Sequence, residues 1–103
     1  MTMAHPTDRP DELADQVAAA ALSVPGVDGL HAGSFGEVGT YLPGRRVAGI
    51  RITDEVTEVH VAVEMGSAIP ALAADVVAAV APLVQSPVQV FVEDVVPARP
   101  DGQ

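Results

Sequence analysis

The chain has 103 residues, with 14 acidic and 5 basic side chains and a formal net charge of −9 at pH 7. A chain of this length forms one domain with a single modest core. Because phosphate binding needs clustered Lys and Arg, this balance argues against nucleic acid and against direct contact with anionic lipid. The sequence contains no cysteine, which excludes disulfides, thiolate catalysis and zinc–thiolate sites.

Apolar residues make up 49% of the chain but aromatic residues only 3%, so the core is expected to consist mainly of alanine and valine. Such side chains bury little area each, and contact with other copies of the chain would add stability. No segment reaches the roughly 20 apolar residues that a membrane-spanning helix needs. Residues 1–10 lack the apolar region of a signal peptide. We therefore expect a soluble, cytoplasmic protein.

A first helix is predicted to begin at Pro10 and to end before Pro25-Gly26. Asp8 or Arg9 can cap it, and the acidic residues after Pro10 lie near the positive end of the helix dipole. Apolar residues then recur at helical spacing. These are Leu13, Val17, Ala20, Ala21 and Val24.

A short strand at 27–31 and a glycine-rich loop follow this helix. The loop ends in Pro43-Gly44-Arg45-Arg46 and shows no regular pattern. From Val47 the apolar period changes to two, with a polar turn at Asp54-Glu55, which predicts an antiparallel hairpin with one apolar face. Its apolar residues are Ile50, Ile52, Val59, Val61 and Val63.

The second predicted helix is apolar nearly all round. Ser67 is its expected cap, Pro70 suits its first turn, and Pro82 should kink or end its last turn. A helix of this kind is usually buried on more than one side, and in so small a domain the second side is expected to meet another subunit or partner. The inner stripe is Ile69, Leu72, Ala73, Val76, Val80 and Leu83, and the outer side carries Ala71, Ala74, Val77, Ala78 and Ala81 around the single charge of Asp75.

A final strand follows Ser86-Pro87, with Val88, Val90 and Val92 inward and Gln89, Phe91 and Glu93 outward. The expected fold class is α+β, with two helices packed on one face of a small mixed three- to four-stranded sheet. The last strand should run parallel to one strand of the hairpin through a right-handed crossover. Residues 10–96 form the predicted domain, between flexible tails at 1–9 and 97–103.

Two groups of residues are candidates for protein contacts. Phe91 lies on the outward side of its strand, near the apolar second helix. Arg45 and Arg46 could pair with an acidic partner or a phosphate, with Tyr41 as an anchor, or form only a solvated loop-to-strand junction. The predicted interaction surface comprises Asp75, Val77, Ala78, Phe91, Tyr41, Arg45 and Arg46.

A metal site is the alternative on the outer sheet face. His60 lies between Glu58 and Glu64, and Glu93 is expected one strand over, so these groups could bind a divalent ion. Residues two apart on a strand project in parallel rather than converging, however, which favours a solvated acidic face. No partner can be named for His5 or His31.

The remaining motifs carry little chemistry. Gly33-Ser34-Phe35-Gly36 fits a pattern that clamps RNA phosphates in one domain class, but Glu37 follows it, and a mobile loop is the other interpretation. No serine is placed beside a base, and capping explains the serines at helix ends and loops. The chain also has little room for a pocket of several hundred cubic ångströms. We therefore predict no enzyme, no catalytic residue, no cofactor and no metal.

Three pieces of the sequence resemble the alkaline-shock-protein family of bacterial envelope stress proteins. They are Val24-Pro25-Gly26-Val27-Asp28-Gly29-Leu30, Val63-Glu64-Met65-Gly66-Ser67-Ala68-Ile69-Pro70 and Val90-Phe91-Val92-Glu93-Asp94-Val95. The resemblance covers residues 17–95, and these motifs are structural rather than catalytic. Many members begin with a strand that residues 1–10 lack, and have more basic residues after the glycine loop.

This resemblance implies a non-enzymatic cytoplasmic stress-response protein. The corresponding expectation is a homo-oligomeric adaptor or scaffold that docks on a membrane-anchored protein partner at the inner face of the cell membrane, without inserting into it. The alternative is a small-ligand or metal-binding module that uses His60 and the outer acids.

Overall fold

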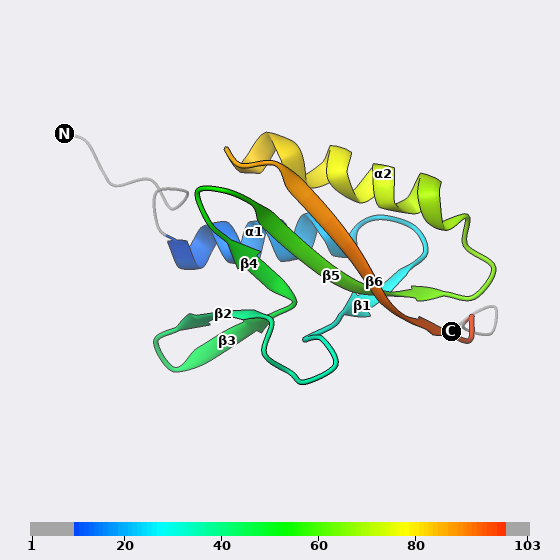
Figure 1. Ribbon diagram of the computed structural model, residues 1–103, viewed down its shortest axis with the longest axis horizontal. Coiled ribbons are helices and arrows are strands. Elements are labelled where there is room, and N and C mark those ends of the chain that lie inside the picture. The colour runs from blue at the N-terminus through cyan, green and yellow to red at the C-terminus, as the bar shows by residue number, and fades with distance from the viewer. Residues whose placement is uncertain (1–9, 99–103) are drawn as a thin grey trace.

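The computed structural model describes residues 10–98, with side chains described from Leu13 onward. Figure 1 shows two helices beside a twisted sheet, with a separate small hairpin at one end. The predicted helix cap at Asp8 or Arg9, the tail at 1–9 and most of the tail at 97–103 lie outside the described residues. In chain order the elements are α1 (Pro10–Leu22), β1 (Val27–Leu30), β2 (Gly39–Leu42), β3 (Arg45–Ala48), β4 (Ile50–Ile52), β5 (Thr57–Glu64), α2 (Ile69–Val80), the 3-10 turn η2 (Ala81–Leu83) and β6 (Val88–Val96).

The central strand of the sheet is β5. β6 pairs with it in parallel along its whole length, from Thr57 opposite Val88 to Glu64 opposite Val96. β1 and β4 both pair antiparallel with the other edge of β5, one after the other. The predicted α+β class is therefore confirmed, with a mixed four-stranded sheet and a parallel last strand.

β1 and β4 meet at a single residue of β5, His60. The N–H of His31 donates to the carbonyl of His60 at 2.8 Å, and the N–H of His60 donates to the carbonyl of Gly49 at 2.9 Å. Gly49 has a φ of 82°, and an added Cβ would lie 2.9 Å from the carbonyl oxygen of His60 and 3.0 Å from that of His31. Only glycine therefore fits this junction without strain.

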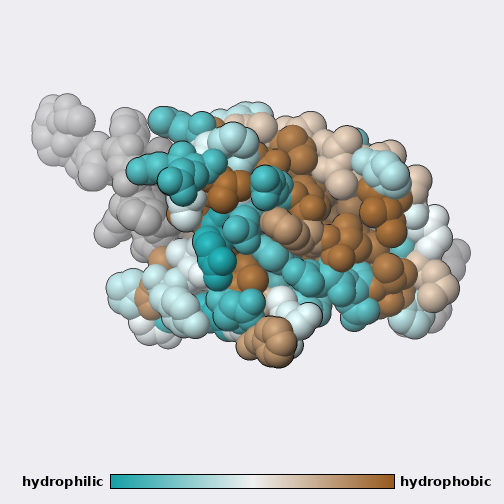
Figure 2. Space-filling model, viewed as in Figure 1, coloured by the Kyte–Doolittle hydropathy of each residue, from teal (hydrophilic) through white to brown (hydrophobic). Residues whose placement is uncertain are grey.

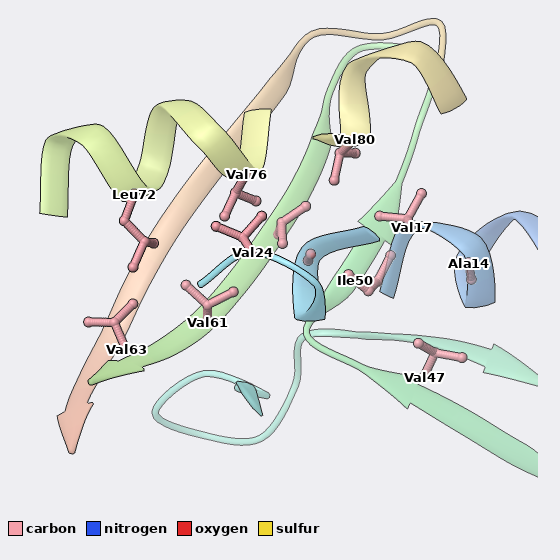
Figure 3. Close-up of a cluster of buried hydrophobic side chains, with 12 residues drawn as sticks. Ala14, Val17, Val24, Val47, Ile50, Val61, Val63, Leu72, Val76 and Val80 are labelled. Carbon is pink, nitrogen blue, oxygen red and sulfur yellow. The ribbon is translucent and has the colours of Figure 1, made fainter. Parts of the chain in front are cut away.

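The core lies between the two helices and one face of the sheet (Figure 3). Val59, Val61 and Val63 are fully buried on this face, as their alternation predicts. Both helices direct apolar stripes onto it, although Ile69, predicted to be inward, is 38% exposed in the first turn of α2. The buried helical and adjoining residues are Ala14, Val17, Ala21, Val24, Leu72, Val76 and Val80.

The glycine-rich segment, predicted to be a loop without regular pattern, holds a hairpin. β2 and β3 pair antiparallel, with Leu42 opposite Arg45, across the two-residue turn Pro43-Gly44. Proline followed by a glycine at φ 76° is the combination that a type II turn uses. Gly49 then separates β3 from β4, so the predicted continuous strand from Val47 is two strands.

The start of α2 also differs from the prediction. Its N-cap is Ala68, which makes no side-chain capping bond, and Pro70 lies in the first turn as expected. Ser67 precedes the cap, and its hydroxyl lies beside Gly26 instead. At the other end, α2 ends at Val80 and gives way to η2, which contains Pro82, so the helix ends there as predicted. Neither helix in the described part of the chain is long and apolar enough to cross a bilayer.

Candidate functional site

The sheet face opposite the helices carries a cluster of polar side chains from β5 and β6. The ring of His60 contacts two carboxylates, with Nδ1 2.6 Å from Glu93 Oε2 and Nε2 2.9 Å from Glu58 Oε1. Phe91 stacks on the same ring with centroids 4.4 Å apart and planes 10° apart. Three side chains from two parallel strands therefore enclose one imidazole.

The enclosed ring is buried, which overturns the expectation of a solvated acidic face at this position. His60 is only 6% exposed. The prediction failed because Glu93 and Phe91 come from the neighbouring strand, and the parallel register places Phe91 directly beside His60. Glu64, which was grouped with His60, is not among its contacts.

The geometry of this cluster leaves neither ring nitrogen of His60 open to a metal ion. Each nitrogen lies within hydrogen-bonding distance of one carboxylate. A metal ion would have to displace one carboxylate from the ring and take its place. Within residues 10–98, no group of three His, Asp or Glu side chains is arranged to hold a metal.

The outer face of α2 is the second candidate region. Ala71, Ala74, Ala78 and Ala81 are exposed, and we call these four residues the α2 face. Asp75 is exposed beside them, whereas Val77, predicted to be part of the outer surface, is half-buried. Figure 2 shows hydrophobic residues gathered over α2 and β6, next to a hydrophilic band over the rest of the sheet.

The predicted contact residues of the glycine-rich segment lie on the β2–β3 hairpin, at the far end of the molecule from α2 (Figure 1). Tyr41 is 74% exposed, and the guanidinium of Arg46 lies over its ring at 5.2 Å. Arg46 also donates to the carbonyls of Gly36 and Val38, at 2.5 and 2.9 Å. These hydrogen bonds hold the Arg46 side chain against its own segment, so its first role is to stabilise the hairpin.

Arg45 anchors the same hairpin to α1. It donates two hydrogen bonds to the carboxylate of Asp15, at 3.0 and 2.7 Å. The hydrogen bond from Arg45, together with its charge, holds the pKa of Asp15 below its usual value against a smaller desolvation effect. The predicted interaction surface is therefore divided among three places: α2, β6 and this hairpin.

Local hydrogen bonds account for two other features of the glycine-rich segment, the Gly33–Gly36 motif and His31. Gly33 and Gly36 form a tight turn, with the N–H of Gly36 donating to the carbonyl of Gly33 at 3.1 Å, and the acidic Glu37 follows. His31, for which no partner was expected, accepts a hydrogen bond at Nδ1 from the N–H of Gly33 at 2.9 Å. The turn is therefore shaped by its own contacts, and it carries an acid where a phosphate clamp needs cations.

Ser86 does not cap a helix or lie in an open loop. It is buried, and its hydroxyl pairs with that of Thr57 at 2.8 Å, which joins the starts of β5 and β6. No serine hydroxyl in the described part of the chain hydrogen-bonds to a histidine, so no nucleophile–base pair is formed there.

An open hollow of about 750 Å³ lies between the start of α1, β4 and η2. The short chain was predicted to have little room for a pocket of this size, and this prediction was wrong. Leu13, Ile52 and Leu83 supply its apolar lining, and Gln16 and Asp54 are among its polar groups. Only Asp54 among the lining residues is titratable, and the lining therefore provides no acid–base pair for catalysis.

Comparison with known proteins identifies no relative of this chain. No protein-family model matches it, and neither the curated proteins nor the solved structures include a match.

Proposed function

We propose that the protein is a non-enzymatic adaptor that associates with further copies of itself through the α2 face. The adaptor would act at the cytoplasmic side of the membrane and dock on a membrane-anchored partner. The membrane and stress-response parts of this proposal come from the resemblance to the alkaline-shock-protein family. The self-association part comes from the surface of α2.

The observation that carries the proposal is that α2 exposes small apolar side chains along its outer side in a single copy. Ala71, Ala74 and Ala78 lie at spacings of three and four, and therefore along one side of the helix. Alanine lets two helices approach closely and loses no side-chain entropy on burial. Asp75 is the single charged residue of α2, so little desolvation opposes contact.

Catalysis and metal binding have less support. The buried histidine is already held by two carboxylates, and the hollow beside η2 lacks paired titratable groups. Small-ligand or metal binding remains the alternative function. A shift of the melting temperature on addition of a divalent metal would favour it, because ligands that bind the native state raise that temperature.

The experiment that tests self-association is light scattering over a range of protein concentrations, on the wild type and on Ala78→Glu. The wild type is expected to form a dimer or a larger species, and Ala78→Glu to shift it toward the monomer, because the new carboxylate must be desolvated in the contact. A strictly monomeric wild type at high concentration would contradict the proposal.

Ala19→Glu is the matched control, because Ala19 is exposed on α1. It introduces the same side chain on the other helix, so it changes net charge equally and leaves the α2 face intact. Assembly should survive this change, and circular dichroism should be the same for both variants. Equal loss of assembly in the two variants would indicate a general charge effect and would show that the α2 face does not form the contact between copies.

A further inference from the structure

The two edges of the sheet differ in how their backbone groups are used. One edge of β5 is covered by β1 and β4, and the other by β6. The outer edge of β6 pairs with no strand among the described residues. A strand edge of this kind presents a row of N–H and C=O groups that can pair with another chain.

The backbone groups at this outer edge can be assigned from the ladder. Successive residues of a strand direct their N–H and C=O groups to opposite edges. The carbonyl of Pro87 accepts from the N–H of Thr57 on β5, at 2.8 Å. Every second residue after Pro87 therefore also turns toward β5, and Val88, Val90 and Val92 turn their N–H and C=O groups outward.

The C-terminal half of β6 is protected against pairing, and the N-terminal half is not. The register between β5 and β6 shifts after Val92, which indicates a bulge. Beyond it, the carboxylate of Asp94 accepts the N–H of Val95 at 2.9 Å. Charges and bulges are devices that blunt an edge. Residues 88–92 contain neither, so this regular stretch is open to an added strand.

Charge indicates which kind of strand would pair there. Residues 52–98 contain no Lys or Arg, whereas Glu58, Glu64, Asp75, Glu93 and Asp94 all lie in this half of the chain. A second copy of β6, paired antiparallel over Val88–Val92, would set Glu93 and Asp94 opposite the uncharged Pro87 and Ser86 and so offer them no opposite charge. A basic strand would meet complementary charge, which favours encounter and register.

We propose that the outer edge of β6, from Val88 to Val92, binds an extended, positively charged segment of a partner protein as an added strand. This inference rests on the proposed adaptor role, because it names a kind of partner that the adaptor would bind. It does not depend on self-association, because it uses β6 and not the α2 face. Main-chain hydrogen bonds supply affinity in this mode, and alternate side chains supply specificity.

The side chains on both faces of β6 define the sequence pattern of this segment. On the helix side, the half-buried Val90 and Val92 would pack against apolar side chains of the added strand. On the open face, Phe91 is 37% exposed and Glu93 lies two residues further along. Alternating apolar and basic residues satisfy both faces, since side chains of a strand alternate between them.

The first test uses a synthetic peptide of alternating valine and arginine, about ten residues long to match a typical strand, with the full-length protein at low ionic strength. Its controls are the same peptide N-methylated at every residue and a valine–glutamate peptide. Fluorescence anisotropy should show that the arginine peptide binds at least about tenfold more tightly than either control. Equal binding of the N-methylated peptide would indicate charge attraction alone and would overturn strand addition.

The second test locates the bound peptide by amide hydrogen exchange. The peptide should slow exchange at Val88, Val90 and Val92, while Gln89 and Phe91, which face β5, should change little. Protection elsewhere, or no binding, would overturn the proposal. Protection of Val90 and Val92 that grows with protein concentration in the absence of peptide would assign the edge to a second copy and would also overturn it.

A pair of protein variants tests whether negative charge next to β6 contributes to peptide binding. Asp94→Asn removes a charge next to the proposed strand, and Glu37→Gln removes one from an exposed loop residue away from β6. Asp94→Asn should weaken peptide binding several-fold, and Glu37→Gln should change it little. Equal effects would overturn the placement at β6. Ala78→Glu should leave peptide binding intact, so failure of the α2 contact and failure of this one are distinguishable.

Discussion

The two edges of β5 differ in how fully the rest of the fold covers them. On one edge, two short strands meet at Gly49, and the β2–β3 hairpin lies beyond them with its arginines bonded to Asp15 and to backbone carbonyls. On the other edge, one long strand continues the sheet and pairs with nothing further in the described residues. The occupied edge depends on specific close contacts, whereas the open edge and α2 are the two surfaces that we propose contact other chains.

The occupied edge should be the more sensitive to substitution, and Gly49→Ala is the most severe test. The added Cβ meets the carbonyl oxygen of His60 at 2.9 Å, in a positive-φ conformation that alanine resists. We expect a loss of about 3 kcal/mol in the free energy of unfolding, measured by urea denaturation.

Gly44→Ala is its matched control. Gly44 has a similar φ of 76°, but an added Cβ there meets no atom within 4 Å. Backbone strain alone should cost about 1 kcal/mol. Equal losses for the two variants would show that the close contact at His60 contributes nothing.

His60→Phe tests the cluster that ties β5 to β6. The substitution keeps a ring beside Phe91 but leaves Glu58 and Glu93 without their shared donor. Hydrogen bonds to charged groups suggest a loss of about 2 kcal/mol in the free energy of unfolding. The same loss in a background that already carries Glu58→Gln and Glu93→Gln would contradict coupling between these side chains.

Thr57→Val tests the hydroxyl pair at the start of the same two strands. It removes the hydrogen bond to Ser86 at nearly constant volume, and Ser86 is buried. The free energy of unfolding should fall by about 1 kcal/mol. Combining Thr57→Val with Ser86→Ala should cost less than the sum of the single changes, because the pair is lost only once. Strict additivity would exclude an interaction.

The smallest effect is expected for Asp15→Asn, at the exposed ion pair with Arg45. Arg45 lowers the pKa of Asp15 in the folded protein, so the stabilisation is present above the unfolded value of 3.8 and is lost as pH falls through the folded pKa. The melting temperatures of wild type and variant should therefore differ slightly at neutral pH and converge in acid. A difference that grows in acid would have the wrong sign.

The fold could be predicted from the sequence where apolar periodicity was regular. The helical spacing in α1 and α2 and the alternation of Val59, Val61 and Val63 placed three elements on the correct faces. The β2–β3 hairpin was missed because glycines interrupt its alternation and because Arg46 secures the preceding loop by bonds to backbone carbonyls. Local pattern carries no signal for such contacts.

The candidate sites depended on information that the sequence holds only indirectly. The positions of His60 and Glu93 on the outer face followed from alternation, but their convergence required the register of β6 against β5. The exposure of the α2 face could be predicted, because the helix has more apolar positions than one sheet face can cover. The hollow beside η2 had no signal, since its lining comes from several separate segments.

The most direct test of the account is a dilution series followed by residue-resolved NMR of the full-length protein. Self-association through α2, with the β6 edge left open, predicts that the methyl signals of Ala71, Ala74 and Ala78 shift with concentration. The amides of Val90 and Val92 should exchange rapidly at every concentration. Alanine signals that do not move, or β6 amides that become protected as concentration rises, would contradict the central claim.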